Sequence, residues 1–303
     1  MKRILAIYYS QSGQLKNIID SVISPIRTEK DIEIDYLQLK PTTDYPFPWK
    51  NEFFNCFPES VKGIPCSMEP YNLDLDKDYD LILLGHQPWY LSPSIPVWSF
   101  LSSKEASNFF KGKNVVTIIG ARNMWVGAQE IIKNKLSELN ARLVGNIVLQ
   151  DKTDNIIAGI TIIKWLIHGN KGPSHILPEA GVSKKDIANA SIYGKIIKSY
   201  INNDIEELQP ELRKNRAVKV KYHLLNIELN ARKIFCKFAD LALKHKKNSP
   251  MHRKKTIKLF KGYLLFALFL VSPFFSLIFM IARVLFFPLA NKKLDYYASV
   301  KSR

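Results

Sequence analysis

The first 150 residues alternate short apolar runs with segments whose apolar residues recur at helical spacing. The runs are rich in branched and aromatic residues and cover 3–9, 31–39, 81–85, 114–120 and 142–149. The run 31–39 alternates with period two, as an edge strand with one wet face does, whereas 81–85 is continuously apolar. Apolar positions between the runs predict helices over 14–26 and 128–139. This alternation predicts a parallel, doubly wound α/β sheet.

The remaining segments are less regular. The stretch 41–80 is long, aromatic and Pro-containing, and we expect it to cross one side of the sheet as an irregular excursion. Short helices are predicted over 156–168 and 184–201. Residues 218–246 form one basic amphipathic helix, which either packs on the domain or lies at a membrane surface. We divide the chain into three units, at 1–202, 203–250 and 251–303.

Charge is concentrated in the last third of the chain. Of the net charge of +17, residues 1–200 carry +3 and residues 201–303 carry +14. A basic tail fits either nucleic acid or a membrane surface. Residues 262–282 contain no charged side chain over 21 positions, and a bilayer core requires roughly 20 apolar residues in a helix. The tail is therefore interpreted as a membrane anchor, and no nucleic acid is expected as a partner.

The topology of this anchor is open at the level of sequence. Lysines and arginines flank the apolar run on both sides, so the positive-inside rule favours neither orientation. Ser272-Pro273 lies in mid-run and can kink or turn a helix. A hairpin that enters one leaflet keeps both flanks on the cytoplasmic face of the cell membrane, and we favour it over a single span. A buried helix of a soluble dimer is the third alternative. The flanking lysines favour anionic lipid.

The remaining composition limits the chemistry. Cys56, Cys66 and Cys236 are odd in number and lack metal-ligand spacing, so we read them as ordinary thiols and expect no metal. The apolar stretch at the N-terminus, 4–9, is too short for a signal peptide, which favours a cytoplasmic domain.

Three loops follow the first, third and fourth predicted strands, at the carboxyl edge where such sheets bind ligands. The first, Ser10-Gln11-Ser12-Gly13-Gln14, opens a helix and offers hydroxyls and unpaired amides to a phosphate. The same residue types also serve simply as helix caps. The second loop, 85–93, carries adjacent aromatic residues suited to stacking on a planar ring, and the third, 120–125, carries another.

The stretch Tyr8-Tyr9-Ser10-Gln11-Ser12-Gly13-Gln14, with the aromatic second loop and the glycine-led third, resembles the flavodoxin-like superfamily over about residues 1–202. The resemblance implies five parallel strands in the order 2-1-3-4-5 and an FMN cofactor. It implies phosphate contacts from Ser10, Gln11, Ser12, Gly13 and Gln14. It also implies ring contacts from Pro88, Trp89 and Tyr90 on one side and from Gly120, Arg122, Asn123 and Trp125 on the other. Gln14 and Lys16 depart from the superfamily pattern, and Lys16 would supply charge to the phosphate.

In layout, and in the loop Arg122-Asn123-Met124-Trp125, the chain is similar to the dialkylresorcinol condensing-enzyme family. That resemblance implies a ketosynthase partner and oxidation of a cyclohexanedione to an aromatic resorcinol. His86 and His175 are candidate bases, and Arg122 can steady an enolate oxygen or form a salt bridge at the rim. The leading hypothesis is a membrane-associated, FMN-dependent oxidoreductase acting on a lipophilic cyclic ketone. The alternatives are a tethered flavodoxin-type electron carrier or quinone reductase, and a flavin-free scaffold for a ketosynthase.

Overall fold

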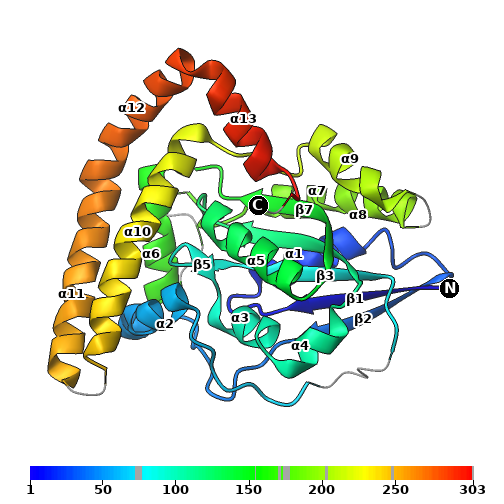
Figure 1. Cartoon of the computed structure of the whole chain (residues 1–303), viewed down its shortest axis with the longest axis horizontal. Coiled ribbons are helices and arrows are strands. Elements are labelled where there is room, and N and C mark those ends of the chain that lie inside the picture. The colour runs from blue at the N-terminus through cyan, green and yellow to red at the C-terminus, as the bar shows by residue number, and fades with distance from the viewer. Residues whose placement is uncertain are drawn as a thin grey trace.

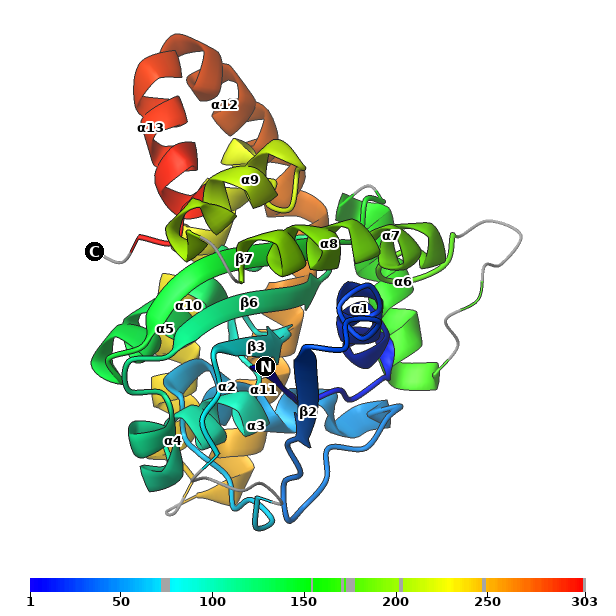
Figure 2. The same ribbon diagram turned by 90° about the vertical axis from the view of Figure 1, so that its right-hand side faces the viewer.

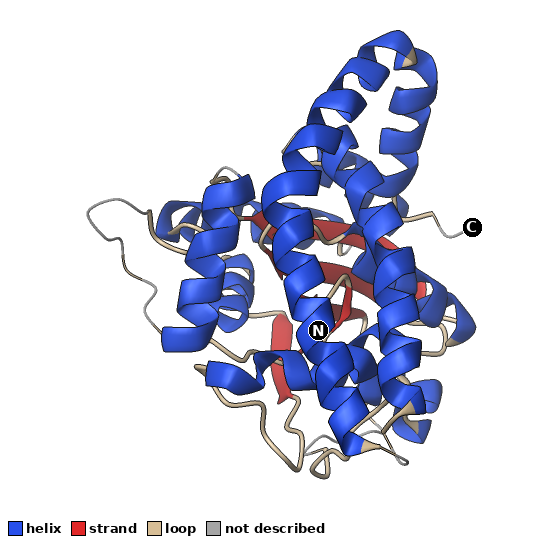
Figure 3. Ribbon diagram, turned by 90° about the vertical axis from the view of Figure 1, so that its left-hand side faces the viewer, coloured by secondary structure: helices blue, strands red, loops and turns tan. Residues whose placement is uncertain are grey.

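The computed structural model describes residues 1–71, 77–153, 155–169, 172, 178–201, 204–246 and 249–301. A twisted sheet lies at the centre, with helices on both of its faces (Figure 1). A group of long C-terminal helices stands along one side of this sheet and projects beyond it (Figures 1 and 3).

The sheet has five parallel strands in the order β2-β1-β3-β6-β7. The strands are β1 (Lys2–Tyr8), β2 (Ile32–Gln38), β3 (Leu81–His86), β6 (Asn114–Ala121) and β7 (Arg142–Gln150). This is the flavodoxin-like order, and it confirms the sequence prediction. The predicted edge strand is β2, and the continuously apolar run is the central strand β3, which is buried at every position.

Alternate residues of each strand enter two cores, one on each face. On one face, Ile4 and Ala6 pack against four helices. They are α1 (Gln14–Ile23), α7 (Lys184–Asn189), α8 (Ser191–Tyr200) and α9 (Leu208–Lys214). On the other face, Leu5 and Ile7 meet α3 (Ile95–Leu101), α4 (Lys104–Phe109) and α5 (Val126–Glu138). Figure 2 shows α1, α7 and α8 gathered on one side of the sheet.

Local sequence accounts for the position of α1. Its buried residues recur at helical spacing along one face: Leu15, Ile18, Ile19, Val22 and Ile23. The helix packs closely on α8, because Gly194 has no side chain there. A Cβ atom at that position would lie 1.8 Å from the Val22 carbonyl oxygen.

The core of the first unit continues past the predicted boundary at residue 202. Leu208, Leu212 and Ala217 are fully buried in it, and the Ala217 carbonyl accepts a hydrogen bond from Val148 N at 2.8 Å. The excursion 41–80 is more ordered than expected. It contains a 3-10 helix (Lys50–Cys56) and α2 (Phe57–Lys62), and the hairpin strands β4 (Pro88–Trp89) and β5 (Ser92–Pro93) follow β3.

The described residues of the C-terminal third from 222 to 298 form helices joined by short turns. They comprise α10 (Tyr222–Lys244), α11 (Pro250–Phe266), a π-helical stretch (Ala267–Val271), α12 (Ser272–Leu285) and α13 (Phe287–Ala298). α10 lies between the domain and the continuous helix α11–α12 (Figure 1). Its buried residues include Leu225 and Phe235, so this amphipathic helix packs on the domain.

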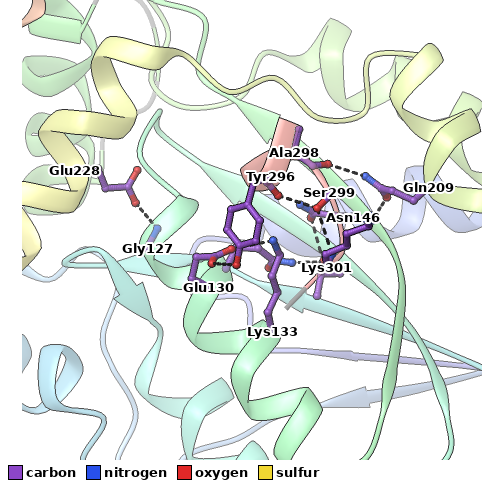
Figure 4. A network of polar contacts seen from close by, with 12 residues as sticks. Gly127, Glu130, Lys133, Asn146, Gln209, Glu228, Tyr296, Ala298, Ser299 and Lys301 are labelled. Atoms are coloured by element: carbon purple, nitrogen blue, oxygen red, sulfur yellow. Dashed lines mark hydrogen bonds and ion pairs between the residues drawn. The ribbon is translucent and has the colours of Figure 1, made fainter. Parts of the chain in front are cut away.

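The end of the chain returns to the domain. After a reversal at Phe286, α13 brings Tyr297 into a core with Leu225 and Trp125. Figure 4 shows the polar contacts that accompany this packing. The Tyr296 hydroxyl donates to Glu130 Oε2 at 2.9 Å, and Gln209 Nε2 donates to the Ala298 carbonyl at 3.1 Å. The C-terminal end of the α11–α13 segment is therefore fixed to the domain.

Candidate functional site

A cavity of about 170 Å³ opens at the carboxyl edge of the sheet. All three predicted loops reach it, with Ser12 from the first, Trp89 from the second and Gly120 from the third. The helix α6 (Asn155–His168) and the 41–53 segment close its other sides. The first loop and the two loops with aromatic residues thus share one crevice.

The first loop leaves a helix N-terminus open to the cavity. Gly13 caps α1 in the left-handed region, at φ +81°, and has no side chain to bond the amides of the first turn. No acidic residue lies in that turn, and a Cβ atom on Gly13 would meet nothing within 4 Å. The Ser10 hydroxyl accepts from Lys16 N at 3.2 Å. Open amides at the positive end of a helix dipole are suited to an anion.

Three side chains of this region have partners within the protein. Gln14 forms two hydrogen bonds with the backbone of Val182, at 3.1 and 3.2 Å. Gln11 lines the cavity, and its amide donates to the carbonyls of Tyr45 and Pro46 at 3.3 Å. Lys16 pairs with Asp20 at 2.5 Å and is not among the residues that line the cavity. The predicted role of Lys16 as a phosphate partner therefore has no support in this geometry.

The second loop contributes a wall of packed rings. Pro88, Trp89 and Tyr90 line the cavity as expected. Trp89 is held at its edges by the rings of Trp49 and Tyr45, with centroids 4.8 and 5.0 Å away. Tyr90 adopts the left-handed region, at φ 51°, and its hydroxyl donates to the Phe53 carbonyl at 2.5 Å. These contacts fix the wall in place before any ligand arrives.

The third loop supplies the charge of the cavity. Gly120 and Arg122 line it, and Arg122 is the only charged side chain among the described lining residues. Burial lowers the pKa of the Arg122 guanidinium to about 10, while the charge of Asp151 acts in the opposite direction. The group therefore remains a cation at neutral pH. Asn123 is buried, and its Oδ1 accepts from Arg122 Nε at 3.1 Å.

Two sequence expectations are wrong. Trp125 does not line the cavity, because its ring is buried in the core beneath α10 with Ile119 and Leu225. His86 is fully buried at the end of β3, and its Nε2 contacts Gln129 Oε1 at 3.0 Å. Burial lowers the pKa of His86 to about 4, so the ring is neutral, and it does not reach the cavity. His175, the other predicted base, lies outside the described residues.

Several lining residues were not predicted. Ile162, Trp165 and Leu166 come from α6, which lies over the cavity. The segment before the 3-10 helix adds further rings at Phe47 and Trp49. The Leu166 carbonyl accepts from Trp49 N at 2.7 Å, which ties these two walls together. For the rings at Phe47 and Trp49, the only signal in the sequence was the density of aromatic residues in 41–54.

Glu228 of α10 is a further unpredicted residue next to the site. Its carboxylate is buried and accepts from Gly127 N at 2.7 Å, at the N-terminus of α5 (Figure 4). Burial raises the pKa of Glu228 to about 7, although the backbone N–H groups of Gly127, Val126 and Trp125 act to lower it. The tail helix α10 thus holds the end of the third loop. Within the described residues, no group of three or more His, Cys, Asp and Glu side chains is placed to bind a metal ion.

Comparisons with known proteins give likeness in fold only. No protein-family model matches the sequence, and no curated protein matches it. A flavoprotein from Lactobacillus acidophilus, solved in complex with FMN, is 19% identical, with a TM-score of 0.40 over 55% of this chain and 99% of its own. A flavodoxin from the domain Archaea is 14% identical, with a TM-score of 0.38 over 67% and 100%. A flavone reductase is 11% identical, with a TM-score of 0.36 over 68% and 65%.

Proposed function

We propose that this chain is a membrane-associated, FMN-dependent oxidoreductase that acts on a lipophilic, planar carbonyl substrate. One observation carries the proposal. A single cavity at the carboxyl edge of the sheet is lined by Ser12 at an open helix N-terminus and by Trp89 in a wall of rings. A nucleotide with a phosphate at one end and a planar ring at the other requires this pairing.

The residues fit FMN in the chemistry of their donors. Ser12, Gly13 and the first-turn amides of α1 other than that of Lys16, which bonds Ser10, would hold the phosphate, with the helix dipole as the compensating charge. Trp89 and Tyr90 would bound the ring on one side, and Gly120 on another. When bound, FMN supplies a two-electron hydride acceptor. The protein supplies binding, orientation and exclusion of water by the packed rings.

The lining also favours one kind of substrate. It contains a buried cation, Arg122, and within its described residues no carboxylate or histidine. Arg122 can steady an enolate oxygen in a setting of low dielectric. A substrate that enolises without an enzymic base, such as a 1,3-cyclohexanedione, suits this set. Its conversion to a resorcinol removes one hydride and one proton, for which bound FMN would supply the hydride acceptor and water the proton acceptor.

Membrane association rests on the tail. The segment Pro250–Leu285 is long and apolar enough to cross a bilayer. The turn after it exposes Leu285 and Phe287, and nearby Lys292 is exposed as well. The chain reverses at Phe286 and not at Ser272-Pro273, where the helix continues. Because α13 is packed on the domain, we propose that this hairpin of α12 and α13 dips into one leaflet from the cytoplasmic face. Its lysines suit anionic lipid, each contributing about 1 kcal/mol near the surface.

The proposal is tested by ligand titration of the detergent-solubilised full chain. FMN should bind and give a flavin absorption spectrum. Ser12→Asp places a carboxylate at the helix N-terminus and should weaken FMN binding about 100-fold, because it repels the phosphate. Riboflavin, which lacks the phosphate, should bind this variant within about threefold of the parent chain. Ser107→Asp, on the exposed surface of α4, is the matched control. A parent chain that rejects FMN overturns the proposal.

A second measurement separates an enzyme from an electron carrier. Under anaerobic conditions, a long-chain 1,3-cyclohexanedione should bleach the bound flavin and yield one resorcinol per FMN. A carrier would bind FMN equally well and remain yellow with this compound. Unbleached flavin therefore leaves cofactor binding intact and contradicts the substrate class.

A further inference from the structure

The apolar helix of the tail meets the wall of the cavity at α6. Along α6, Ile162, Trp165 and Leu166 line the cavity. One turn earlier, Gly159 packs against Leu268 of the tail. A Cβ atom on Gly159 would lie 2.6 Å from Leu268 Cδ2. At this residue, α6 contributes no side chain to the wall between the tail and the cavity.

Arg122 lies on the cavity side of the same place. Its Nη1 is 3.3 Å from the position that a Cβ atom on Gly159 would occupy, and its side chain lines the cavity. A buried cation therefore stands immediately behind an apolar contact. The outer side of this wall is apolar and its inner side is cationic. This arrangement suits an amphiphile that enters with its polar end first.

The tail is also irregular where it meets α6. Leu268 belongs to the π-helical stretch Ala267–Val271, which interrupts the long helix between α11 and α12. Such stretches break the regular hydrogen-bond ladder and occur often at functional sites. Phe266 and Leu270, on either side of Leu268, are exposed. Leu268 itself is half-buried, so its contact with Gly159 lies next to the exposed apolar residues that we assign to lipid.

We propose that the substrate is an amphiphile carried in the bilayer, which enters the cavity between α6 and the π-helical stretch. Its oxygen-bearing end points to Arg122, and its hydrocarbon chain lies along Gly159 and Leu268. The chemistry of the substrate rests on the proposed function, whereas the route rests on these contacts alone. A water-soluble substrate would have no need of an entry route between two apolar helices.

Photolabelling in vesicles tests the route. The probe is palmitate with a diazirine next to its carboxylate, which mimics the polar end of such an amphiphile. In the full chain, labelling should fall on the peptide 155–168. Gly159→Leu fills the passage and should lower this labelling at least fivefold. Gly262→Leu is the matched control, because a Cβ atom there meets nothing within 4 Å, and its labelling should stay within twofold of the parent chain.

A second pair of variants removes side chain from the contact. It therefore does not depend on a bulky residue that could displace α6. Leu268→Ala should raise labelling of 155–168 two- to threefold. Leu270→Ala, an exposed position of the same π-helical stretch, should leave it unchanged. Equal labelling within either pair of variants, or labelling confined to the exposed turn at 284–289, would overturn the route.

The flavin absorption of the same samples keeps the two proposals apart. A chain that holds FMN but is unlabelled at 155–168 overturns the route and leaves the flavin proposal standing. A chain that is labelled there but rejects FMN supports the route and overturns the proposed oxidoreductase.

Discussion

The sheet and the C-terminal hairpin use the same apolar residue types and expose them to opposite degrees. In the sheet, Leu5 and Leu83 are fully buried. At the turn between α12 and α13, Leu285 is 71% exposed and Leu289 is 69% exposed. Apolar content alone therefore does not tell where a side chain lies in this protein. The number of protein surfaces that can cover a side chain decides whether it is buried.

The difference has a simple structural cause. A central strand such as β3 has neighbouring strands at its edges and helices over both faces, so every side chain meets protein. The helix α11–α12 packs against α10 along one side, and most of its remaining surface is exposed. An exposed apolar surface of that extent is typical of a site for a membrane or a protein partner.

The largest expected effect comes from placing charge at the turn. Leu285→Glu combined with Phe287→Glu should weaken binding to anionic vesicles roughly 1,000-fold, because each carboxylate costs about 2 kcal/mol in the apolar layer. Flotation or sedimentation with vesicles measures the change. Ser102→Glu with Ser107→Glu adds the same charge on the exposed surface around α4 and should change binding less than threefold. An equal loss in both double variants would contradict the hairpin as the lipid-binding element.

A smaller effect should follow from weakening the contact between the end of α13 and the domain. Tyr297→Ala removes a buried ring that joins α13 to the core, and it should cost about 3 kcal/mol in the free energy of unfolding. Hydrogen exchange should then become faster over 287–298, while the strands stay protected. Tyr297→Phe keeps the ring and should cost less than about 1 kcal/mol. Unchanged exchange in the alanine variant would show that α13 is not held by this contact.

The smallest effect concerns the link between the two regions, Glu228. Because its folded pKa of about 7 lies above the ordinary value of 4.5, the unfolded chain binds fewer protons between these values. The contribution of this residue to the free energy of unfolding therefore falls as pH rises from about 4.5 to 7. Glu228→Gln removes this pH dependence. The free energy of unfolding of the variant, relative to that of the parent chain, should therefore rise by about 2 kcal/mol between pH 5 and pH 8.

Urea denaturation at several pH values measures this gain. His86, with its lowered pKa of about 4, acts in the opposite sense over the same range, so only the difference between variant and parent isolates Glu228. Glu105→Gln, an exposed position on α4, is the control. A constant difference from pH 5 to pH 8 would contradict a protonated Glu228 in the folded protein.

The sequence predicted most of the sheet and part of the site. Each predicted strand agrees with the structure within about one residue, because parallel strands buried on both faces give long apolar runs. The first and second loops were placed correctly, because the loops after parallel strands meet at one edge. Trp125 was misassigned because a loop residue can turn toward either the cavity or the core. Here α10, nearly a hundred residues later, supplies the core.

The sequence by itself determined which segments are strands and that the tail is basic and apolar. These properties follow from local periodicity and charge, which are carried by neighbouring residues. Only the tertiary structure decided that α6 closes the cavity, that Glu228 holds the third loop and that the chain end returns to the domain. Those features depend on contacts between residues far apart in the chain, such as Gly127 with Glu228 and Gly159 with Leu268. No local pattern specifies which distant surface a helix will cover.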